Sequence, residues 1–248
     1  MNRVSHRSSG TGKVVEVEAF LSILQLSDSA FPNGRYTQSF GLETFAQSSE
    51  LASPDPAQLT ALLADWVRFG VGPSDAVALA CAHRALGPGE LIDLKLVASA
   101  DERLTAVKLA RESRETSART GRAVLSSFRA IVSATPMREY VDLVHSGRCP
   151  GNHAIVLGLL TAWLGVPRLE AVAGEIYAFC ASWVAAAVRL GIADHLVAQL
   201  VLHEGRAACA KAARKAVDGD VREISSCTPL VDVMAMRHEQ AELRLFAS

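Results

Sequence analysis

The chain has 248 residues, of which 50% are hydrophobic and 21% are charged. This balance is typical of a folded globular protein and excludes the class of disordered chains, which combine low hydrophobicity with high net charge. The formal net charge of −1 gives no general attraction to nucleic acid or to an anionic membrane, because such binding depends on clustered excess lysine and arginine. We therefore expect one large domain, with neither nucleic acid nor membrane as a partner.

The cysteines and the first residues of the chain indicate a compartment. The five cysteines show no CxxC spacing, and scattered thiols in odd number are typical of a long chain in a reducing compartment. Residues 1–17 contain no apolar stretch like that of a secretory signal, so we expect a flexible amino-terminal tail. These features predict a cytoplasmic protein. The cysteines are Cys81, Cys149, Cys180, Cys209 and Cys227.

In the first half of the chain, apolar residues recur at helical spacing between turn signals. An early loop contains Pro32 and Gly34. Further on, Gly70 and Gly72 are expected to end one helix and Pro73 to begin the next. The helices expected in this half cover residues 19–26, 36–46, 59–69, 76–86 and 91–99.

The second half contains the clearest amphipathic pattern, which predicts one long surface helix over residues 101–132 that ends before Pro136. Residues 149–188 are the most hydrophobic part of the chain, but charged residues such as Arg168 and Glu175 interrupt them, so we expect buried core helices and no membrane span. Strand signals are almost absent. We expect an all-α fold, an irregular multi-helix bundle in a single domain. The remaining expected helices cover residues 138–145, 152–164, 168–190 and 193–217.

Most motifs that would indicate chemistry fail on inspection. Residues 10–13 read GTGK, but a phosphate-binding loop also needs a glycine at position 7 and a Ser or Thr at position 14, where Arg7 and Val14 stand. Neither His203 nor His238 has the second histidine of a zinc peptidase helix. The acidic pair at residues 101–102 is expected at a helix start, where the helix dipole favours acids. We therefore assign no catalytic, cofactor-binding or metal-binding residue.

Cys149 and His153 are the nearest approach to a metal site. Two ligands alone would make at best a weak or transient site. The plainer interpretation is a histidine at a helix start beside a small buried cysteine. The arginine-rich face of residues 111–122 is interleaved with glutamates, which favours a solvated, salt-bridged surface over a docking site for an acidic protein.

Two segments resemble the signatures of one family. Residues 24–43 read LQLSDSAFPNGRYTQSFGLE, and residues 229–239 read PLVDVMAMRHE, followed by RLFAS at 244–248. Both resemble segments of the UreF family of urease accessory proteins, and the sequence GNHA at residues 151–154 is a weaker match. The chain departs from the family pattern at Arg35, where many members carry glycine, and at residues 192–199, which replace a common Gly-Gln repeat.

The resemblance implies an all-helical protein without catalytic activity or cofactor. Such a protein forms a homodimer, binds the accessory protein UreD, also called UreH, and recruits the GTPase UreG to apo-urease for nickel insertion. It influences when GTP is hydrolysed and helps to enclose the path of nickel. We expect residues 18–228 to form the helical body and residues 229–248 a partner-binding tail, partly mobile in the isolated protein; the alternative is a packed terminal helix.

The resemblance also leads to a set of expected partner-binding residues, in which Tyr36 and Arg244 shape the docking surface together. Two alternatives stay open. The protein could carry nickel directly through Cys149, His153 and His238, or it could be a helical enzyme that binds a small anionic substrate through Arg111, Arg114 and His83. The expected partner-binding residues are Pro32, Gly34, Tyr36, Glu43, Phe45, Met236, Arg237, His238, Glu239 and Arg244.

Overall fold

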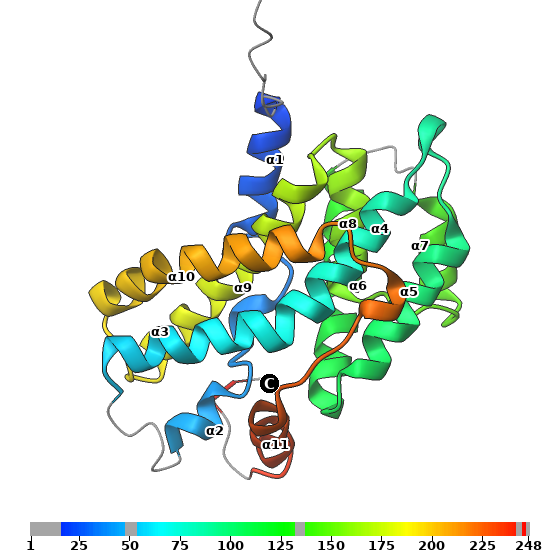
Figure 1. Ribbon diagram of the computed structural model, residues 1–248. Helices are drawn as coiled ribbons and strands as arrows, with labels where there is room; N and C mark the ends of the chain where they lie inside the picture. The colour runs from blue at the N-terminus through cyan, green and yellow to red at the C-terminus, as the bar shows by residue number, and fades with distance from the viewer. Residues whose placement is uncertain (1–15, 48–53, 132–136, 242–244, 247–248) are drawn as a thin grey trace, which may run out of the picture.

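The computed structural model describes residues 16–47, 54–131, 137–241 and 245–246, without the side chain of Tyr36. Within these residues the regular structure is helical (Figure 1), and the one extended pairing is an isolated bridge between Leu86 and Ile92. The all-α, single-domain prediction is confirmed. The helices are α1 (Val17–Ser27), η1 (Arg35–Thr37), α2 (Leu42–Gln47), α3 (Pro56–Asp65), η3 (Trp66–Ala76), α4 (Val77–Ala85), η4 (Pro88–Glu90), α5 (Leu94–Val107), α6 (Arg111–Ile131), α7 (Arg138–His145), α8 (His153–Trp163), α9 (Arg168–Arg189), α10 (His195–Ala216), η5 (Val221–Glu223) and α11 (Pro229–His238).

The core is built around α8, which packs against α4, α5, α6 and α9. Every residue from His153 to Thr161 is buried, so this helix is apolar on all sides, as a helix enclosed by others must be. By length and composition α9 is the one described helix that could cross a membrane, but most of its apolar window is buried inside the protein. It contributes Ile176 and Trp183 to the core, as expected for a core helix.

The predicted end of a helix at Gly70 and Gly72 is wrong, because the chain continues from α3 through the wide turns of η3 into α4. A Cβ at Gly72 would collide with the carbonyl oxygen of Val67, so glycine permits this backbone. Pro73 cannot donate a backbone hydrogen bond. Carbonyls exposed by the irregular turns are taken up by the segment that precedes α11: Cys227 N–H donates to Phe69 O at 2.9 Å and Ser225 N–H to Pro73 O at 3.0 Å.

The predicted single helix over residues 101–132 is also wrong. The chain leaves the helical path between Val107 and Arg111, so that α5 and α6 are separate helices. Asp101 therefore lies inside α5, fully buried, and not at a helix start. Its carboxylate accepts hydrogen bonds from Tyr140 Oη at 2.9 Å, from Gly151 N at 2.9 Å and from both nitrogens of Asn152. Asp101 thus fixes the loop that leads into α8.

The helices expected over residues 138–145, 152–164, 168–190 and 193–217 agree with α7, α8, α9 and α10 to within about two residues, the usual uncertainty of helix ends. Residues 10–13 and the expected tail up to residue 15 lie outside the described part of the chain, and so does Arg244. The carboxyl-terminal helix α11 lies against α2 and α6 at one end of the bundle, far from α1 in Figure 1.

Candidate functional site

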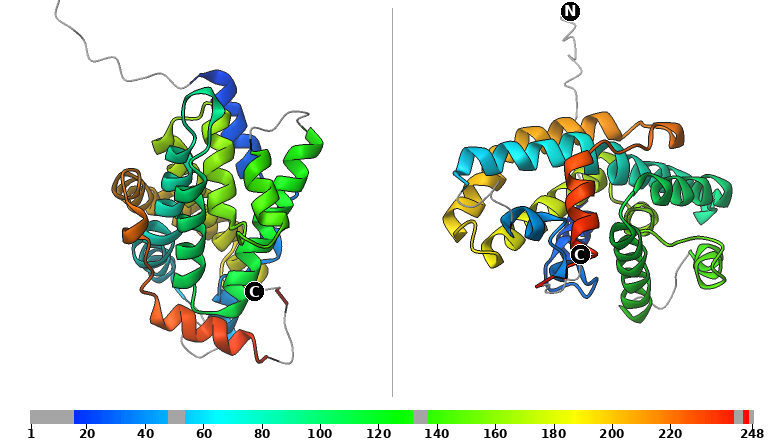
Figure 2. Two further views of the ribbon diagram at one scale, coloured as in Figure 1. Left: turned by 90° about the vertical axis from the view of Figure 1, so that its right-hand side faces the viewer. Right: turned by 90° about the horizontal axis from the view of Figure 1, so that it is seen from below.

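The two segments that carry the family resemblance meet at α11. Figure 2, seen from below, shows this helix beside the early segment that contains η1 and α2. One side of α11 faces the body of the protein, where Met234 is 1% exposed and His238 2% exposed. The opposite side carries three exposed apolar residues three positions apart: Leu230, Val233 and Met236, which are 49%, 43% and 40% exposed. Helical spacing places these on one face, hereafter the outer stripe of α11.

His238 is held between two carboxylates, Glu43 from α2 and Glu112 from α6. Its Nδ1 lies 2.8 Å from Glu112 Oε2 and its Nε2 lies 3.0 Å from Glu43 Oε2. Each ring nitrogen of His238 therefore has one carboxylate oxygen within hydrogen-bond distance. We call these three residues the clamp. The clamp joins three segments, because His238 lies 126 residues after Glu112 and 195 residues after Glu43 in the sequence.

Glu43 also binds the end of the chain. Its carboxylate accepts the backbone N–H of Leu245 at 2.8 Å and that of Phe246 at 3.2 Å. The Arg189 guanidinium at the end of α9 lies 4.6 Å from the centre of the Phe246 ring, a cation–π distance. One buried carboxylate of the first segment therefore organises both α11 and the residues that follow it.

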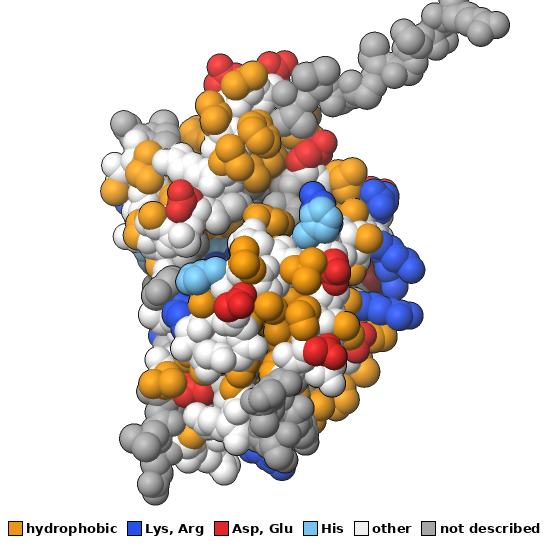
Figure 3. Space-filling model, turned by 90° about the vertical axis from the view of Figure 1, so that its left-hand side faces the viewer, with side chains coloured by type: hydrophobic (Ala, Val, Ile, Leu, Met, Phe, Trp, Pro, Cys, Tyr) orange, Lys and Arg blue, Asp and Glu red, His pale blue; other side chains and the backbone are white. Residues whose placement is uncertain are grey.

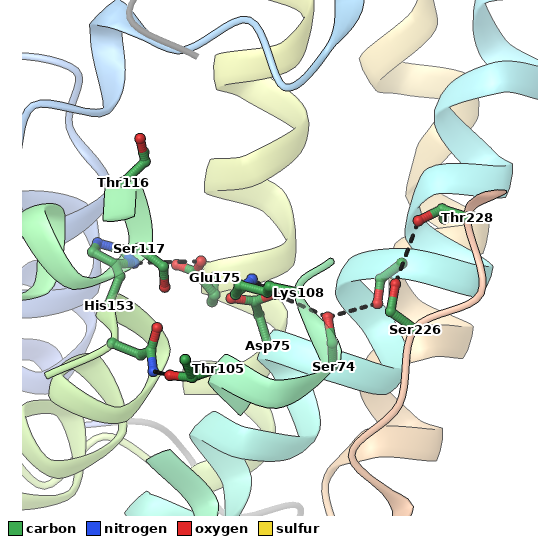
Figure 4. Close-up of polar contacts among 12 residues, drawn as sticks. Ser74, Asp75, Thr105, Lys108, Thr116, Ser117, His153, Glu175, Ser226 and Thr228 are labelled. Carbon is green, nitrogen blue, oxygen red and sulfur yellow. Dashed lines mark hydrogen bonds and ion pairs between the residues drawn. The ribbon is translucent and has the colours of Figure 1, made fainter. Parts of the chain in front are cut away.

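A cavity of about 160 Å³, lined by both apolar and polar residues, lies beside the clamp. Figure 4 shows part of its wall, with Ser117, His153 and Glu175 on one side and Asp75, Lys108 and Ser74 further along. Three of its lining residues each contain a buried atom without a hydrogen-bond partner among the described residues: Gln38 Nε2, Ser117 Oγ and His153 Nε2. Buried polar atoms of native proteins are normally paired with protein or water, so water at these three positions would satisfy them.

Arg35, Glu175 and His153 form a buried charged group at this cavity. Arg35 Nη1 lies 2.8 Å from Glu175 Oε2, and His153 Nδ1 lies 3.6 Å from Glu175 Oε1. Burial alone would raise the pKa of Glu175, but Arg35 and His153 outweigh it and lower that pKa to about 2. Glu175 is therefore a permanent anion at neutral pH. Arg35, the residue that departs from the family pattern, is its main partner.

A second ion pair also lines the cavity. Lys108 Nζ, in the turn between α5 and α6, contacts both oxygens of Asp75, at 2.7 Å and 3.0 Å. Asp232 of α11 also lines the cavity, and burial is the main cause that raises its pKa. The lining residues include four carboxylic acids against one lysine and one arginine, so the cavity favours cations and neutral polar molecules over anions. The four acids are Asp75, Glu112, Glu175 and Asp232.

The expected residues of the first segment occupy varied positions. Phe45 is buried against Trp66, with ring centres 5.4 Å apart. Gly34 is exposed with φ of +77°, the left-handed region that favours glycine. The Pro32 carbonyl accepts a hydrogen bond from Ser127 Oγ. Tyr36 lies in η1, but its side chain and the whole of Arg244 are outside the described residues, so their proximity stays a prediction.

In the second segment, His238 faces the body, whereas Met236 and Arg237 are exposed. Glu239 lies between: its Oε1 accepts the backbone N–H of Glu112 at 3.0 Å, and its Oε2 lies 3.9 Å from Arg111 Nε. Whether these residues bind a partner stays a prediction. The structure places Glu43 and His238 in the clamp and Glu239 beside it, and it leaves Met236 and Arg237 facing solvent.

The geometry gives little support to the two alternatives, a direct nickel carrier and a helical enzyme. Both nitrogens of His238 are engaged by carboxylates, and no group of three or more metal-ligating side chains was found among the described residues. For the enzyme alternative, His83 Nε2 contacts the carbonyl of Val166, and Arg114 donates to backbone carbonyls. Neither residue lines the cavity.

Several residues that organise this region were missed at the sequence level. Glu112 appeared as one acid of a salt-bridged helix face, and Glu175 as an interruption of an apolar segment. The usable signal for Glu175 was a charge inside an otherwise apolar helix, because an isolated charge is rarely buried without a partner. No comparable signal marks Glu112, since its partners His238 and Glu239 come from the carboxyl-terminal end of α11.

A separate apolar surface lies on α1. Phe20, Leu21 and Leu24 are each more than half exposed. In Figure 3 the apolar side chains of this helix gather at the top of the face shown, and others continue over the body below. Contiguous exposed apolar residues of this size are typical of protein contact surfaces.

Comparison with known proteins identifies the family. The UreF family model matches residues 54–206. The urease accessory protein UreF of Trichodesmium erythraeum is 31% identical over 237 residues, which are 94% of this chain and 98% of that protein. UreF of Cereibacter sphaeroides is 33% identical over 229 residues, which are 92% of this chain and 98% of that protein. UreF 2 of Brucella canis is 28% identical over 226 residues, which are 91% of this chain and 90% of that protein. The chain belongs to the UreF family of urease accessory proteins.

Proposed function

We propose that this protein is a non-catalytic cytoplasmic adaptor for nickel insertion into urease, which binds UreD/UreH through α11 and with it recruits the GTPase UreG to apo-urease. Membership of the UreF family supports the general role in urease maturation. The observation that carries the finer proposal is the outer stripe of α11. Three exposed apolar side chains on a helix that is fixed from its inner side are a preorganised contact surface.

The clamp explains why the stripe is presented in one orientation. His238 lies on the face of α11 opposite to Val233, and the two carboxylates that hold it come from separate helices. A partner helix or loop that covers Leu230, Val233 and Met236 then meets a rigid surface and loses less entropy on binding than with a mobile tail. In this proposal the complex also sets the time at which UreG hydrolyses GTP.

The exposed face of α1 supports a second contact, the homodimer. Val17, Phe20, Leu21 and Leu24 are 66%, 52%, 56% and 51% exposed. In Figure 1 α1 and α11 lie at opposite ends of the molecule, so self-association through α1 would leave the outer stripe accessible. Sedimentation of Phe20→Asp tests this part: we expect monomers, with co-purification of UreD/UreH retained.

The cavity supports a role in enclosing the path of the nickel cargo. The unpaired His153 Nε2 is a nitrogen ligand of the kind that Ni²⁺ accepts, and the acidic lining favours a cation. Equilibrium dialysis of the isolated protein should show no tight stoichiometric nickel binding. His153→Ala should assemble with all partners and transfer nickel more slowly. This result would distinguish a role of the cavity in nickel transfer from the role of the protein as an adaptor.

Co-purification tests the adaptor proposal itself. UreD/UreH and UreG should be recovered with the wild-type chain and lost with Val233→Asp, because an aspartate in the stripe would bury an unpaired charge on binding. Leu196→Asp is the matched control, because it places an aspartate at an apolar residue of α10 that is 82% exposed and lies outside α11. Normal recruitment of UreG by Val233→Asp would refute the assignment of α11, and catalytic turnover of the isolated chain would refute the adaptor role.

A further inference from the structure

Two cysteines that have no part in the proposed function are in direct contact. Cys180 of α9 and Cys209 of α10 have their sulfur atoms 3.5 Å apart. The two helices lie side by side along much of their length (Figure 1). No other pair of cysteine sulfurs in the described part of the chain makes such a contact.

The two thiols differ in environment. Cys180 is 1% exposed and therefore closed to solvent, whereas Cys209 is partly exposed. The hydrogen bond from the Cys180 thiol lowers the pKa of Cys209, and the same bond together with burial raises the pKa of Cys180. The thiolate is the reactive form of cysteine. An accessible, more acidic thiol next to a second thiol is the arrangement found at cysteines that oxidise to a disulfide.

We propose that Cys180 and Cys209 form an oxidation site, at which hydrogen peroxide converts the two thiols into a disulfide that joins α9 to α10. In the first step the Cys209 thiolate attacks one peroxide oxygen, the O–O bond breaks, and the leaving hydroxide takes up a proton to give water and a Cys209 sulfenic acid. In the second step the Cys180 sulfur attacks the Cys209 sulfur, the S–O bond breaks, and the hydroxide leaves as water with the Cys180 proton. Two electrons pass from the sulfurs to the peroxide.

The bond would tie together two helices that serve different parts of the structure. Cys180 follows Glu175 by five residues on α9, so the cross-link would fix the helix that carries one wall of the cavity. Cys180 and Cys209 are 29 residues apart in the sequence. A disulfide that closes a loop of this length restricts the unfolded chain and so stabilises the folded protein. We therefore expect the oxidised protein to have a higher Tm, a shift that a thiol reductant reverses.

Mass spectrometry tests the proposal on the full chain. The purified protein is treated with hydrogen peroxide, alkylated under denaturing conditions at acid pH to prevent exchange, and digested with trypsin. Cleavage after arginine and lysine releases residues 169–189 with Cys180 and residues 207–211 with Cys209. We expect these two peptides to be linked, with the loss of two of the five thiols. Recovery of both as separate, alkylated peptides, while Cys227 is oxidised, would overturn the proposal.

Variants test the order of the steps. In Cys180→Ser, Cys209 should stop at the sulfenic acid and react with dimedone, whereas Cys209→Ser should give no adduct on Cys180. The reverse pattern would overturn the assigned roles. Cys227→Ser, which changes an exposed cysteine elsewhere, should form the linked peptides as the wild type does. Circular dichroism of each variant before treatment shows that a missing link does not come from a failure to fold.

Discussion

Asp101 and His238 both lie at the centre of a buried polar cluster, but the two clusters join different kinds of structure. Asp101 accepts from the backbone of the loop before α8 and from Tyr140 and Asn152, all within the helical body. His238 is held by one carboxylate on each side, and those carboxylates come from α2 and α6. The first cluster builds the core, and the second attaches a peripheral helix to it.

The difference lies in what happens when each cluster opens. Loss of the Asp101 bonds would leave buried backbone groups at the start of α8 without partners, and the core could not retain its packing. Loss of the clamp would release α11, whose outer stripe already faces solvent, while α4, α8 and α9 keep their contacts. Partner binding can therefore depend on the clamp although global folding does not.

Asp101→Ala should have the largest effect on stability. It removes one acceptor for several buried donors, and breaking such a network costs roughly 3–5 kcal/mol. Chemical denaturation should show this loss over the whole molecule. Asp142→Ala, an exposed aspartate on α7, serves as the control and should change the free energy of unfolding by less than about 0.5 kcal/mol. Similar losses for both variants would contradict the account of the Asp101 cluster.

His238→Ala should have a smaller and more local effect, on the order of 2–4 kcal/mol, because it leaves the buried carboxyl groups of Glu43 and Glu112 without the ring that joins them. Amide hydrogen exchange should accelerate in α11 and at residues 245–246, with little change in α8. Replacing Glu43 and Glu112 by Gln in the same variant should recover part of the loss, since no unpaired charge then remains. Equal acceleration in α8 and α11 would remove the distinction between the two clusters.

Glu175 provides a test by pH. Its pKa of about 2 in the folded protein lies below the ordinary value of 4.5, so ionised Glu175 stabilises the fold above about pH 4.5. This contribution, on the order of 3 kcal/mol, should disappear as the pH falls from 4.5 toward 2. Equilibrium unfolding across this range should show a weaker pH dependence for Glu175→Gln than for the wild type. An unchanged dependence would show that Arg35 and His153 do not stabilise the anion.

The smallest expected effect is that of Gly34→Ala. Gly34 has φ of +77° and no atom within 4 Å of an added Cβ, so backbone strain alone should cost about 1 kcal/mol. Gly34→Asn should cost less, because asparagine tolerates this region better. Thermal unfolding of the two variants measures the difference. A neutral Gly34→Ala would show that the loop before η1 adopts another conformation.

Local patterns predicted the helices but not the clusters. The apolar segments at residues 152–164 and 168–190 predicted α8 and α9 with bounds correct to about two residues. The local pattern failed at η3, where Gly72 and Pro73 are the usual signals of a helix end and the chain nevertheless continues, since residues 225–227 satisfy the carbonyls that the wide turns expose. Glu43 and His238 were chosen through the family resemblance; Glu112 could not be found, because its partners are set only by the tertiary fold.

Hydrogen exchange with and without UreD/UreH tests the central claim, that α11 is a fixed contact surface whose outer stripe receives the partner. The account predicts measurable protection of α11 in the free chain and a further, selective increase in α11 when the partner is bound, with Val233→Asp showing the first and not the second. Protection by the partner confined to α10 or α1, with α11 unchanged, would contradict it.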